Sequence, residues 1–292
     1  MVRHFLVLPI IEQDFRIGSS MYEWQFALLC VAVLLIAAAG YLINNYFDVG
    51  IDRINKPNSS QLGGLTLKQA ERWYVTLNLV AIFIGLFVAY QVGNYRLVYI
   101  FITVTGLLYL YSKVLKKIPL LGNVLVALVT AMVVSMPIFF EEPSIFSSDP
   151  LYLTAGKYLW WSAGVYFVFA FFGNLAREVV KDLEDMRGDE LGGRFTIPVA
   201  WGEKSAKFIA IFILLLLVRA LLFVQQKHII AGSFDFPIYT GILIDLPAVV
   251  AMIMIYRANT TKDYHRISQL LKAIILLGIL SMPLYDGLVI GQ

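Results

Sequence analysis

Two short segments contain the side chains of this 292-residue chain that could do chemistry. Each opens on an asparagine with acids four and eight residues later: Asn44, Asp48 and Asp52 in "NNYFDVGID", and Asn174, Glu178 and Asp182 in "NLAREVVKDLEDMRGDE". Residues at this spacing share one face of an α-helix, so each segment is expected to present a stripe of oxygen donors. Such donors suit divalent cations, and Mg²⁺ usually takes one or two carboxylates and completes its octahedron with water and substrate phosphate.

The second segment extends its stripe and also contains basic residues. Its later acids, Asp185 and Asp189, fall on the same helix face as Glu178 and Asp182. Basic side chains beside the acids could bind phosphate oxygens, pair with carboxylates, or anchor the helix ends at the membrane surface. The candidates for binding a phosphorylated substrate are Arg53, Lys56, Lys116, Arg177 and Lys181. A solvated helix end where acids gather by chance is the simpler interpretation, but it does not explain why the same spacing occurs twice.

The elements that must position these acids are membrane helices. Charged residues make up 15% of the chain and apolar residues 59%, whereas soluble domains have about 25% and about 45–50%. A run of about 20 apolar residues spans a bilayer as a helix. Eight full spans are predicted, at 24–43 and at about 72–92, 95–112, 119–140, 155–177, 205–226, 236–256 and 267–288. The opening "MVRHFLVLPII" is too short to cross and is interpreted as the end of a truncated first helix.

Lysine and arginine are concentrated in alternate loops. The loops on one side are rich in them, whereas those on the other hold only Arg16, Arg96, Lys157 and Lys227. The positive-inside rule places the rich loops, and both acidic segments with them, in the cytoplasm. We therefore expect a multi-pass protein of the cell (inner) membrane. The formal net charge of +3 needs no nucleic-acid partner.

Several stretches resemble signatures of the UbiA superfamily of intramembrane prenyltransferases, in order and over nearly the whole chain. "NNYFDVGIDRINKP" resembles the first signature, N-D-x-x-D-x-x-x-D, and "REVVKDLEDMRGD" resembles the second, with its D-x-x-x-D carried by Asp185 and Asp189. "YSKVLKKIPLLGN" at 111–123 resembles the family's loop between its fourth and fifth helices, and "GGRFTIPVAWG" at 192–202 resembles the segment that follows the second signature. One departure is Asn45, where the family usually has an aspartate.

The resemblance implies one all-α prenyltransferase domain over 1–292, with pseudo-repeated halves at about 1–140 and 141–292 and a central cavity open to the cytoplasm. It implies transfer of a prenyl group from a polyprenyl diphosphate to a lipid or aromatic acceptor, through an allylic carbocation and with release of diphosphate. Within the superfamily, the sequence of these segments is most similar to the branch that prenylates geranylgeranylglyceryl phosphate with geranylgeranyl diphosphate. Two Mg²⁺ per site are implied, one held by Asn44, Asp48 and Asp52 and the other by Glu178, Asp182, Asp185 and Asp189.

Aromatic residues, one acid inside a late span and two polar stretches complete the predictions. Aromatic side chains near the motifs, Tyr111 among them, could stabilise a carbocation or contact the substrate. Asp245, inside a late span, is expected to pair with a polar neighbour rather than to touch substrate. The stretch "KPNSSQLGGLTLKQAER" at 56–72 is expected to be a loop that leads into a short helix, and "DMRGDELGGR" is expected to be mobile. Both cytoplasmic loops are expected to cap the loaded site.

Four other functions stay open from the sequence alone. A transporter or channel would hold its acids near the bilayer midplane, whereas these lie at one face. A terpene cyclase of the same superfamily would ionise the same diphosphate but use an internal alkene as the nucleophile, and a quinone-pathway enzyme would use an aromatic acceptor. A binding protein without activity is suggested by Asn45 and the short first helix. No obligate protein partner is expected beside the substrates and membrane lipid.

Overall fold

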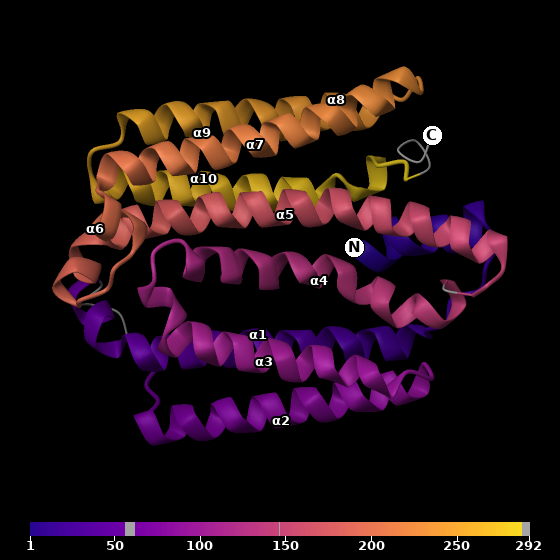
Figure 1. Ribbon diagram of the computed structural model, residues 1–292, viewed down its shortest axis with the longest axis horizontal. Helices are drawn as coiled ribbons and strands as arrows, with labels where there is room; N and C mark the ends of the chain where they lie inside the picture. Colours follow the sequence, from indigo (N-terminus) through magenta and orange to yellow (C-terminus); the bar gives the residue numbers. More distant parts are fainter. Residues whose placement is uncertain (56–61, 146, 288–292) are drawn as a thin grey trace. The chain divides into compact units, whose positions relative to one another are not determined.

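The computed structural model describes residues 1–55, 62–145 and 147–287, except for the side chains of 51–55 and 142–145 (Figure 1). These ranges contain helices and no β-strand. The α-helices are α1 Glu23–Asn55, α2 Leu67–Gln91, α3 Val98–Lys113, α4 Leu121–Ile145, α5 Pro150–Leu191, α6 Ile197–Trp201, α7 Glu203–Ile230, α8 Asp235–Thr240, α9 Leu246–Arg257 and α10 Thr261–Leu280. The shorter 3₁₀ and π segments are η1 Arg3–Val7, η2 Pro9–Asp14, η3 Tyr95–Leu97, η4 Leu115–Lys117, η5 Gly241–Asp245 and η6 Met282–Leu284.

Eight of the described helical stretches are long and apolar enough to cross a membrane, which confirms the eight predicted spans. In one of them, α8, η5 and α9 run on without a break from Asp235 to Arg257. A helix satisfies its own backbone hydrogen bonds, as hydrocarbon requires of any segment that crosses it. The chain is therefore an all-α, integral, multi-pass membrane protein.

Several helix boundaries differ from the predicted spans, and two of them bear on the predicted loops. Helix α2 begins at Leu67 because Thr66 and Gln69 form a capping box. Helix α5 continues to Leu191, so the prediction of a mobile loop at "DMRGDELGGR" is wrong for residues 185–191. A single glycine, Gly188, costs a helix only about 1 kcal/mol, and the good helix formers around it outweigh that cost. The helix ends where Gly193 adopts a positive φ of 67°.

The chain divides into two compact units. The first unit comprises residues 1–20, 127–184 and 201–292, and the second comprises 21–126 and 185–200. In the second unit, α1 packs against both α2 and α3. Small residues allow this close packing: a Cβ on Gly40 of α1 would lie 2.9 Å from Leu108 Cδ1 of α3. This contact lies one turn before Asn44, where the first acidic segment begins.

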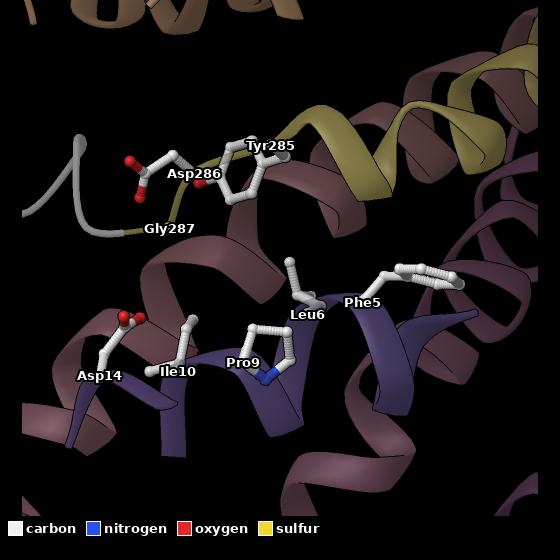
Figure 2. Close-up of a pocket in the computed structure, with 8 residues that line it drawn as sticks. All are labelled: Phe5, Leu6, Pro9, Ile10, Asp14, Tyr285, Asp286 and Gly287. Carbon is white, nitrogen blue, oxygen red and sulfur yellow. The ribbon is translucent and has the colours of Figure 1, made fainter. Parts of the chain in front are cut away.

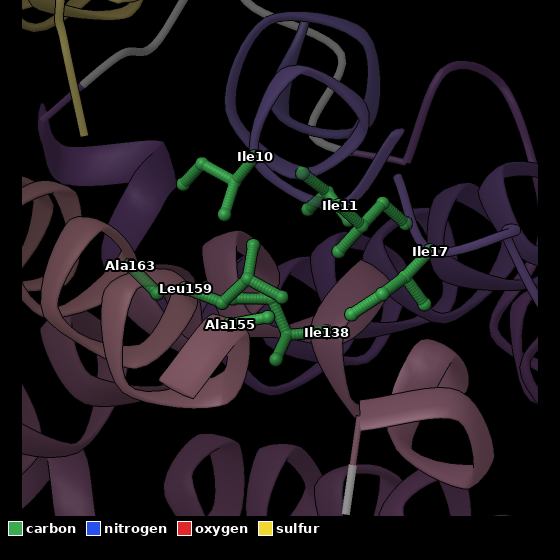
Figure 3. Packing of buried hydrophobic residues seen from close by; sticks show 8 residues of the cluster. Ile10, Ile11, Ile17, Ile138, Ala155, Leu159 and Ala163 are labelled. Carbon is green, nitrogen blue, oxygen red and sulfur yellow. The ribbon is translucent and has the colours of Figure 1, made fainter. Parts of the chain in front are cut away.

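In the first unit, the N-terminal segment packs on α4 and α5 (Figure 3). Ala155, Leu159 and Ala163 of α5 are four residues apart and form one buried stripe. Against it lie side chains of residues 7–17 and Ile138 of α4. At the end of α4, the fully buried Glu141 pairs with Arg3 and also accepts hydrogen bonds from the Ser19 hydroxyl and the Ser20 backbone N–H. These contacts hold the segment before α1 in place.

Candidate active site

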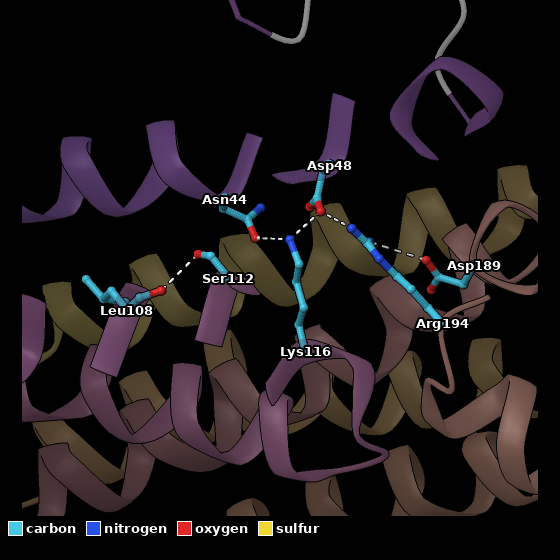
Figure 4. Close-up of polar contacts among 7 residues, drawn as sticks. All are labelled: Asn44, Asp48, Leu108, Ser112, Lys116, Asp189 and Arg194. Carbon is cyan, nitrogen blue, oxygen red and sulfur yellow. Dashed lines mark hydrogen bonds and ion pairs between the residues drawn. The ribbon is translucent and has the colours of Figure 1, made fainter. Parts of the chain in front are cut away.

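Asp48 of α1 lies at the centre of a cluster of charged side chains in the second unit (Figure 4). The ammonium of Lys116 and the guanidinium of Arg194 both donate to the same carboxylate oxygen, Asp48 Oδ1. The Asp48 and Lys116 side chains are only 8% and 6% exposed. Charge-assisted hydrogen bonds of this kind are strong where little water competes for them.

Asn44 lies one turn before Asp48 on the same face of α1, as its spacing predicted. Lys116 Nζ donates to Asn44 Oδ1 at 3.3 Å as well as to Asp48, so one ammonium links the two residues. The start of α4 lies close to the segment that carries this lysine: a Cβ on Gly122 would lie 2.8 Å from the Cα of Lys116. Glycine at 122 thus lets the start of α4 pack directly against η4, which carries Lys116.

Arg194 was not among the predicted site residues, although it lies in the "GGRFTIPVAWG" stretch that resembles the family. Its Nη1 is 3.5 Å from Asp189 Oδ1, and its backbone N–H donates to the Asp189 carbonyl at 2.8 Å. The turn at 192–193 folds the chain back on the end of α5, so Arg194 joins Asp189 to Asp48. Burial lowers the pKa of Arg194 to about 10, which leaves it charged at neutral pH.

The predicted residues of the second acidic segment all lie on α5, but in different units. Asp185 and Asp189 belong to the second unit, where Asp185 is half-buried and Asp189 is buried. The half-buried residues Glu178 and Asp182 belong to the first unit with Arg177 and Lys181. Within that unit Glu178 pairs with Arg177 at 3.2 Å and with Lys181 at 3.6 Å, so both predicted phosphate ligands contact a carboxylate.

The remaining predicted residues are less fully described. Asp52 and Arg53 fall in the last turn of α1, with side chains outside the described part, and Lys56 lies outside the described residues altogether. Tyr111 is half-buried on α3. Within the described residues, no group of three or more His, Cys, Asp or Glu side chains is placed to hold a metal ion. Asp245 accepts a hydrogen bond from Gln225 at 2.6 Å, which confirms its polar pairing.

The donor chemistry of the cluster nevertheless fits a cation. Oxygens of Asn44 and Asp48 converge on one ammonium, and oxygens of Asp48 and Asp189 converge on one guanidinium. Carboxylate and amide oxygens are the ligands of Mg²⁺, which needs only one or two carboxylates when water and phosphate complete its shell. Two positive side chains therefore mark positions where oxygen ligands already meet.

A pocket lies in the first unit, between the N-terminal segment and residues 285–287 (Figure 2). It has a volume of about 270 Å³ and an apolar wall that includes Phe5, Leu6 and Pro9. Two carboxylates, Asp14 and Asp286, also line it. Burial raises the pKa of Asp14, and the negative charge of Asp286 raises it further.

Comparison with known proteins places this site in a family. The model of the UbiA prenyltransferase family matches residues 15–278. The chain belongs to this family. It is 32% identical over 266 residues to the digeranylgeranylglyceryl phosphate synthase of Thermococcus gammatolerans, covering 90% of this chain and 86% of that enzyme.

Solved structures of the family share the fold. The structure of a UbiA homologue from Aeropyrum pernix K1 has a TM-score of 0.66 at 17% identity, over 96% of this chain and 98% of that one. The structure of a UbiA homologue from Archaeoglobus fulgidus bound to DMAPP and Mg²⁺ has a TM-score of 0.56 at 14% identity, over 96% of each chain. Both acidic segments lie inside the matched region of the UbiA family.

Proposed function

We propose that this UbiA prenyltransferase transfers a geranylgeranyl group from geranylgeranyl diphosphate to the hydroxyl of geranylgeranylglyceryl phosphate. The observation that carries the proposal is the convergence of Lys116 and Arg194 on one oxygen of Asp48. The two cations lie beside oxygen ligands. An anionic diphosphate can therefore bind to the cations, and Mg²⁺ can bind to the oxygens that they leave. The synthase name of the Thermococcus gammatolerans relative supports the choice of acceptor.

Mg²⁺ supplies, when bound, the positive charge that makes diphosphate a good leaving group. The Archaeoglobus fulgidus homologue binds Mg²⁺ with DMAPP, which supports the same ion here. We assign one ion to the first acidic segment and a second to the other. The proposed ligands are Asn44, Asp48, Asp52, Glu178, Asp182, Asp185 and Asp189, of which the five aspartates are the proposed catalytic residues.

Lys116 and Arg194 are proposed to leave Asp48 for the diphosphate when substrate binds. Arg194 Nε supports this role because it is a buried donor with no hydrogen-bond partner among the described residues. As the allylic C–O bond breaks, its electron pair stays with the diphosphate oxygen, and the two cations stabilise the charge that develops there. The acceptor hydroxyl then attacks the allylic carbon, and its proton passes to the released diphosphate. Arg177, Lys181, Arg53 and Lys56 remain proposed as further phosphate contacts.

Aromatic side chains adjoin the charged cluster and could shield the carbocation from water. The ring of Phe47 lies 6.0 Å from Lys116 Nζ and 6.0 Å from the ring of Tyr109, in an edge-on arrangement. Tyr109 in turn lies 6.2 Å from Tyr74. The negative faces of such rings stabilise a cation, so we assign Phe47, with the half-buried Tyr111, to the substrate side of the site.

The proposed orientation has both acidic segments at the cytoplasmic face of the cell membrane. It rests on the uneven distribution of lysine and arginine between alternate loops. The substrates are then a prenyl diphosphate that enters from the cytoplasm or bilayer and a membrane-embedded acceptor. No protein partner is needed for this reaction.

The test is product formation by the purified full chain with Mg²⁺ and labelled geranylgeranyl diphosphate. Geranylgeranylglyceryl phosphate, 4-hydroxybenzoate and dihydroxynaphthoate are supplied in separate reactions, and one reaction receives no acceptor. We expect a doubly prenylated glyceryl phosphate and no product with Asp48→Asn. A prenylated aromatic product would change the assigned acceptor to an aromatic compound. A cyclic hydrocarbon in the reaction without acceptor would indicate a cyclase. No diphosphate release in any reaction would refute the proposal.

A further inference from the structure

Arg219 is a charged residue deep inside a membrane span. It is the only charged residue of α7 between Lys207 and Lys227. Those two lysines are 20 residues apart in the sequence, which corresponds to about 30 Å of helix and equals the thickness of the hydrocarbon core. Arg219 therefore lies about 12 Å along the axis from the boundary marked by Lys227. Charges at such depth are rare and usually meet a partner.

The Arg219 side chain has no such partner within the described ranges. It is exposed, and it forms no ion pair or hydrogen bond with any described residue. It lines a groove between α5 and α7 that has a volume of about 520 Å³. An arginine can reach toward an interface along its apolar stem, and here the residue lines the groove itself.

The groove is almost entirely apolar. Its walls include Trp161, Phe169 and Phe172 of α5 and Phe223 of α7, and Arg219 is its one charged lining residue. Gly164 also lines it, and a Cβ there would meet nothing within 4 Å, so the glycine opens the groove. An aromatic hollow with one cation is complementary to a molecule with a hydrocarbon chain and one anionic group.

The groove is separate from the proposed active site. Phe172 and Asp182 lie ten residues apart on α5, or about 15 Å along its axis, and Trp161 lies about 31 Å from Asp182. All of these residues belong to the first unit, and the groove extends along α5 away from the acidic segment. A ligand here would therefore be bound in addition to the diphosphate.

We propose that this groove is a binding site for an anionic phospholipid of the surrounding bilayer. The acyl chain lies against the aromatic wall, and the phosphate headgroup is drawn inward to the Arg219 guanidinium. The lone cation selects a lipid with net negative charge over a zwitterionic one, because a choline group would carry a second positive charge to the same place. The proposal goes beyond prenyl transfer and does not depend on it.

Trp161 provides a direct test, because it lines the groove. The full chain is reconstituted in phosphatidylcholine bilayers that contain increasing fractions of dibrominated phosphatidylglycerol or dibrominated phosphatidylcholine, without prenyl diphosphate or acceptor. Quenching of tryptophan fluorescence is measured in the wild type and in Trp161→Phe. The difference between the two is the quenching of Trp161 in the groove. We expect this signal to saturate at a several-fold lower fraction of the anionic lipid. Arg219→Gln should reduce the preference to about onefold, and Arg219→Lys should retain part of it.

Two further variants make the test specific. Gly164→Leu fills the groove while Arg219 keeps its charge, and it should also abolish the anionic preference. Lys227→Gln removes a charge from the same helix outside the groove and should leave the preference intact. Far-ultraviolet circular dichroism and elution volume verify folding. Three results would each overturn the proposal. The first is equal quenching by both lipids in the wild type, and the second is an unchanged anionic preference in Arg219→Gln and Gly164→Leu. The third is a dimer that shields Trp161 from both lipids.

Discussion

Two buried ion clusters of this molecule differ in what holds their carboxylates. In the first unit, Glu141 accepts a backbone N–H from Ser20 and a hydroxyl from Ser19, and it pairs with Arg3. In the second unit, the cations on Asp48 are the ends of two long side chains. Glu141 is fully buried, whereas the Arg194 side chain is 11% exposed.

The difference indicates which cluster can exchange its partners. A backbone N–H cannot leave Glu141 without moving the chain, so that cluster can only hold the segment before α1 to α4. Lysine and arginine side chains can rotate away from Asp48 and bind another anion while the backbone stays in place. We therefore interpret the Glu141 cluster as structural and the Asp48 cluster as a binding site at rest.

Replacing Asp48 should give the largest effect on turnover. Asp48→Asn keeps the shape but removes the charge that holds Lys116, Arg194 and the proposed metal. We expect diphosphate release to fall by about 10³-fold or more, as when a transition-state contact is lost, with helicity unchanged. The measurement is release of labelled diphosphate by purified protein, normalised to folded protein. Turnover within tenfold of wild type would assign Asp48 to structure and erase the distinction between the clusters.

Glu141→Ala should show the opposite pattern. It leaves the buried Arg3 without its carboxylate, and breaking a buried pair in this way costs about 3–5 kcal/mol. We expect a much lower unfolding midpoint in detergent but near-normal turnover for each molecule that remains folded. Glu12→Gln is the matched control, because Glu12 is exposed and lies in the same N-terminal segment as Arg3. It should change neither the unfolding midpoint nor the turnover. A turnover defect as large as that of Asp48→Asn would mean that both clusters serve catalysis.

The sequence predicted the helices well because their signals are local. Asn44 and Asp48 share a helix face through spacing alone, and the spans follow from the length of apolar runs. Arg194 could not be found in this way, because 146 residues separate it from Asp48 and only the tertiary fold brings them together. The "GGR" turn before it was a usable signal: two glycines after a helix indicate that the chain reverses there and returns the next side chain to the helix end.

The wrong loop at 185–191 has a different cause. Gly188 and the surrounding charges suggested mobility, but the acids that looked like loop residues continue the helical stripe of α5. The pairing of Glu178 with Arg177 and Lys181 was an open alternative in the sequence, since one spacing serves both carboxylate pairing and phosphate binding. Only the folded contacts, together with substrate, can distinguish these uses.

Arg194 tests whether the cations are exchangeable. Arg194→Gln should lower turnover by about 10²-fold, because one donor to the leaving group is lost. Arg194→Lys should recover part of the loss, since it keeps the charge but not the forked geometry. Initial rates at increasing concentrations of prenyl diphosphate separate kcat from KM. An effect of Arg194→Gln on thermal stability alone, with turnover intact, would place this arginine with the structural ions.

The smallest effect is expected at Asp14, whose carboxylate faces Asp286 in the pocket of the first unit. Its pKa is raised by burial and by the charge of Asp286. The folded state thus binds the proton more tightly than the unfolded state, so stability should fall as pH rises from the unfolded pKa of about 3.9 through the folded pKa. The penalty should be below about 1 kcal/mol because water screens this exposed side chain.

Asp14→Asn removes the titrating group and should raise the unfolding midpoint slightly at pH 7, with no gain below pH 3.5. Midpoints in detergent between pH 3 and pH 7 provide the measurement, and Glu12→Gln, two residues away, again serves as the control. If the unfolding midpoints of wild type and Asp14→Asn change in parallel with pH, the charge of Asp286 does not affect the titration of Asp14, and solvent screens the two carboxylates from each other.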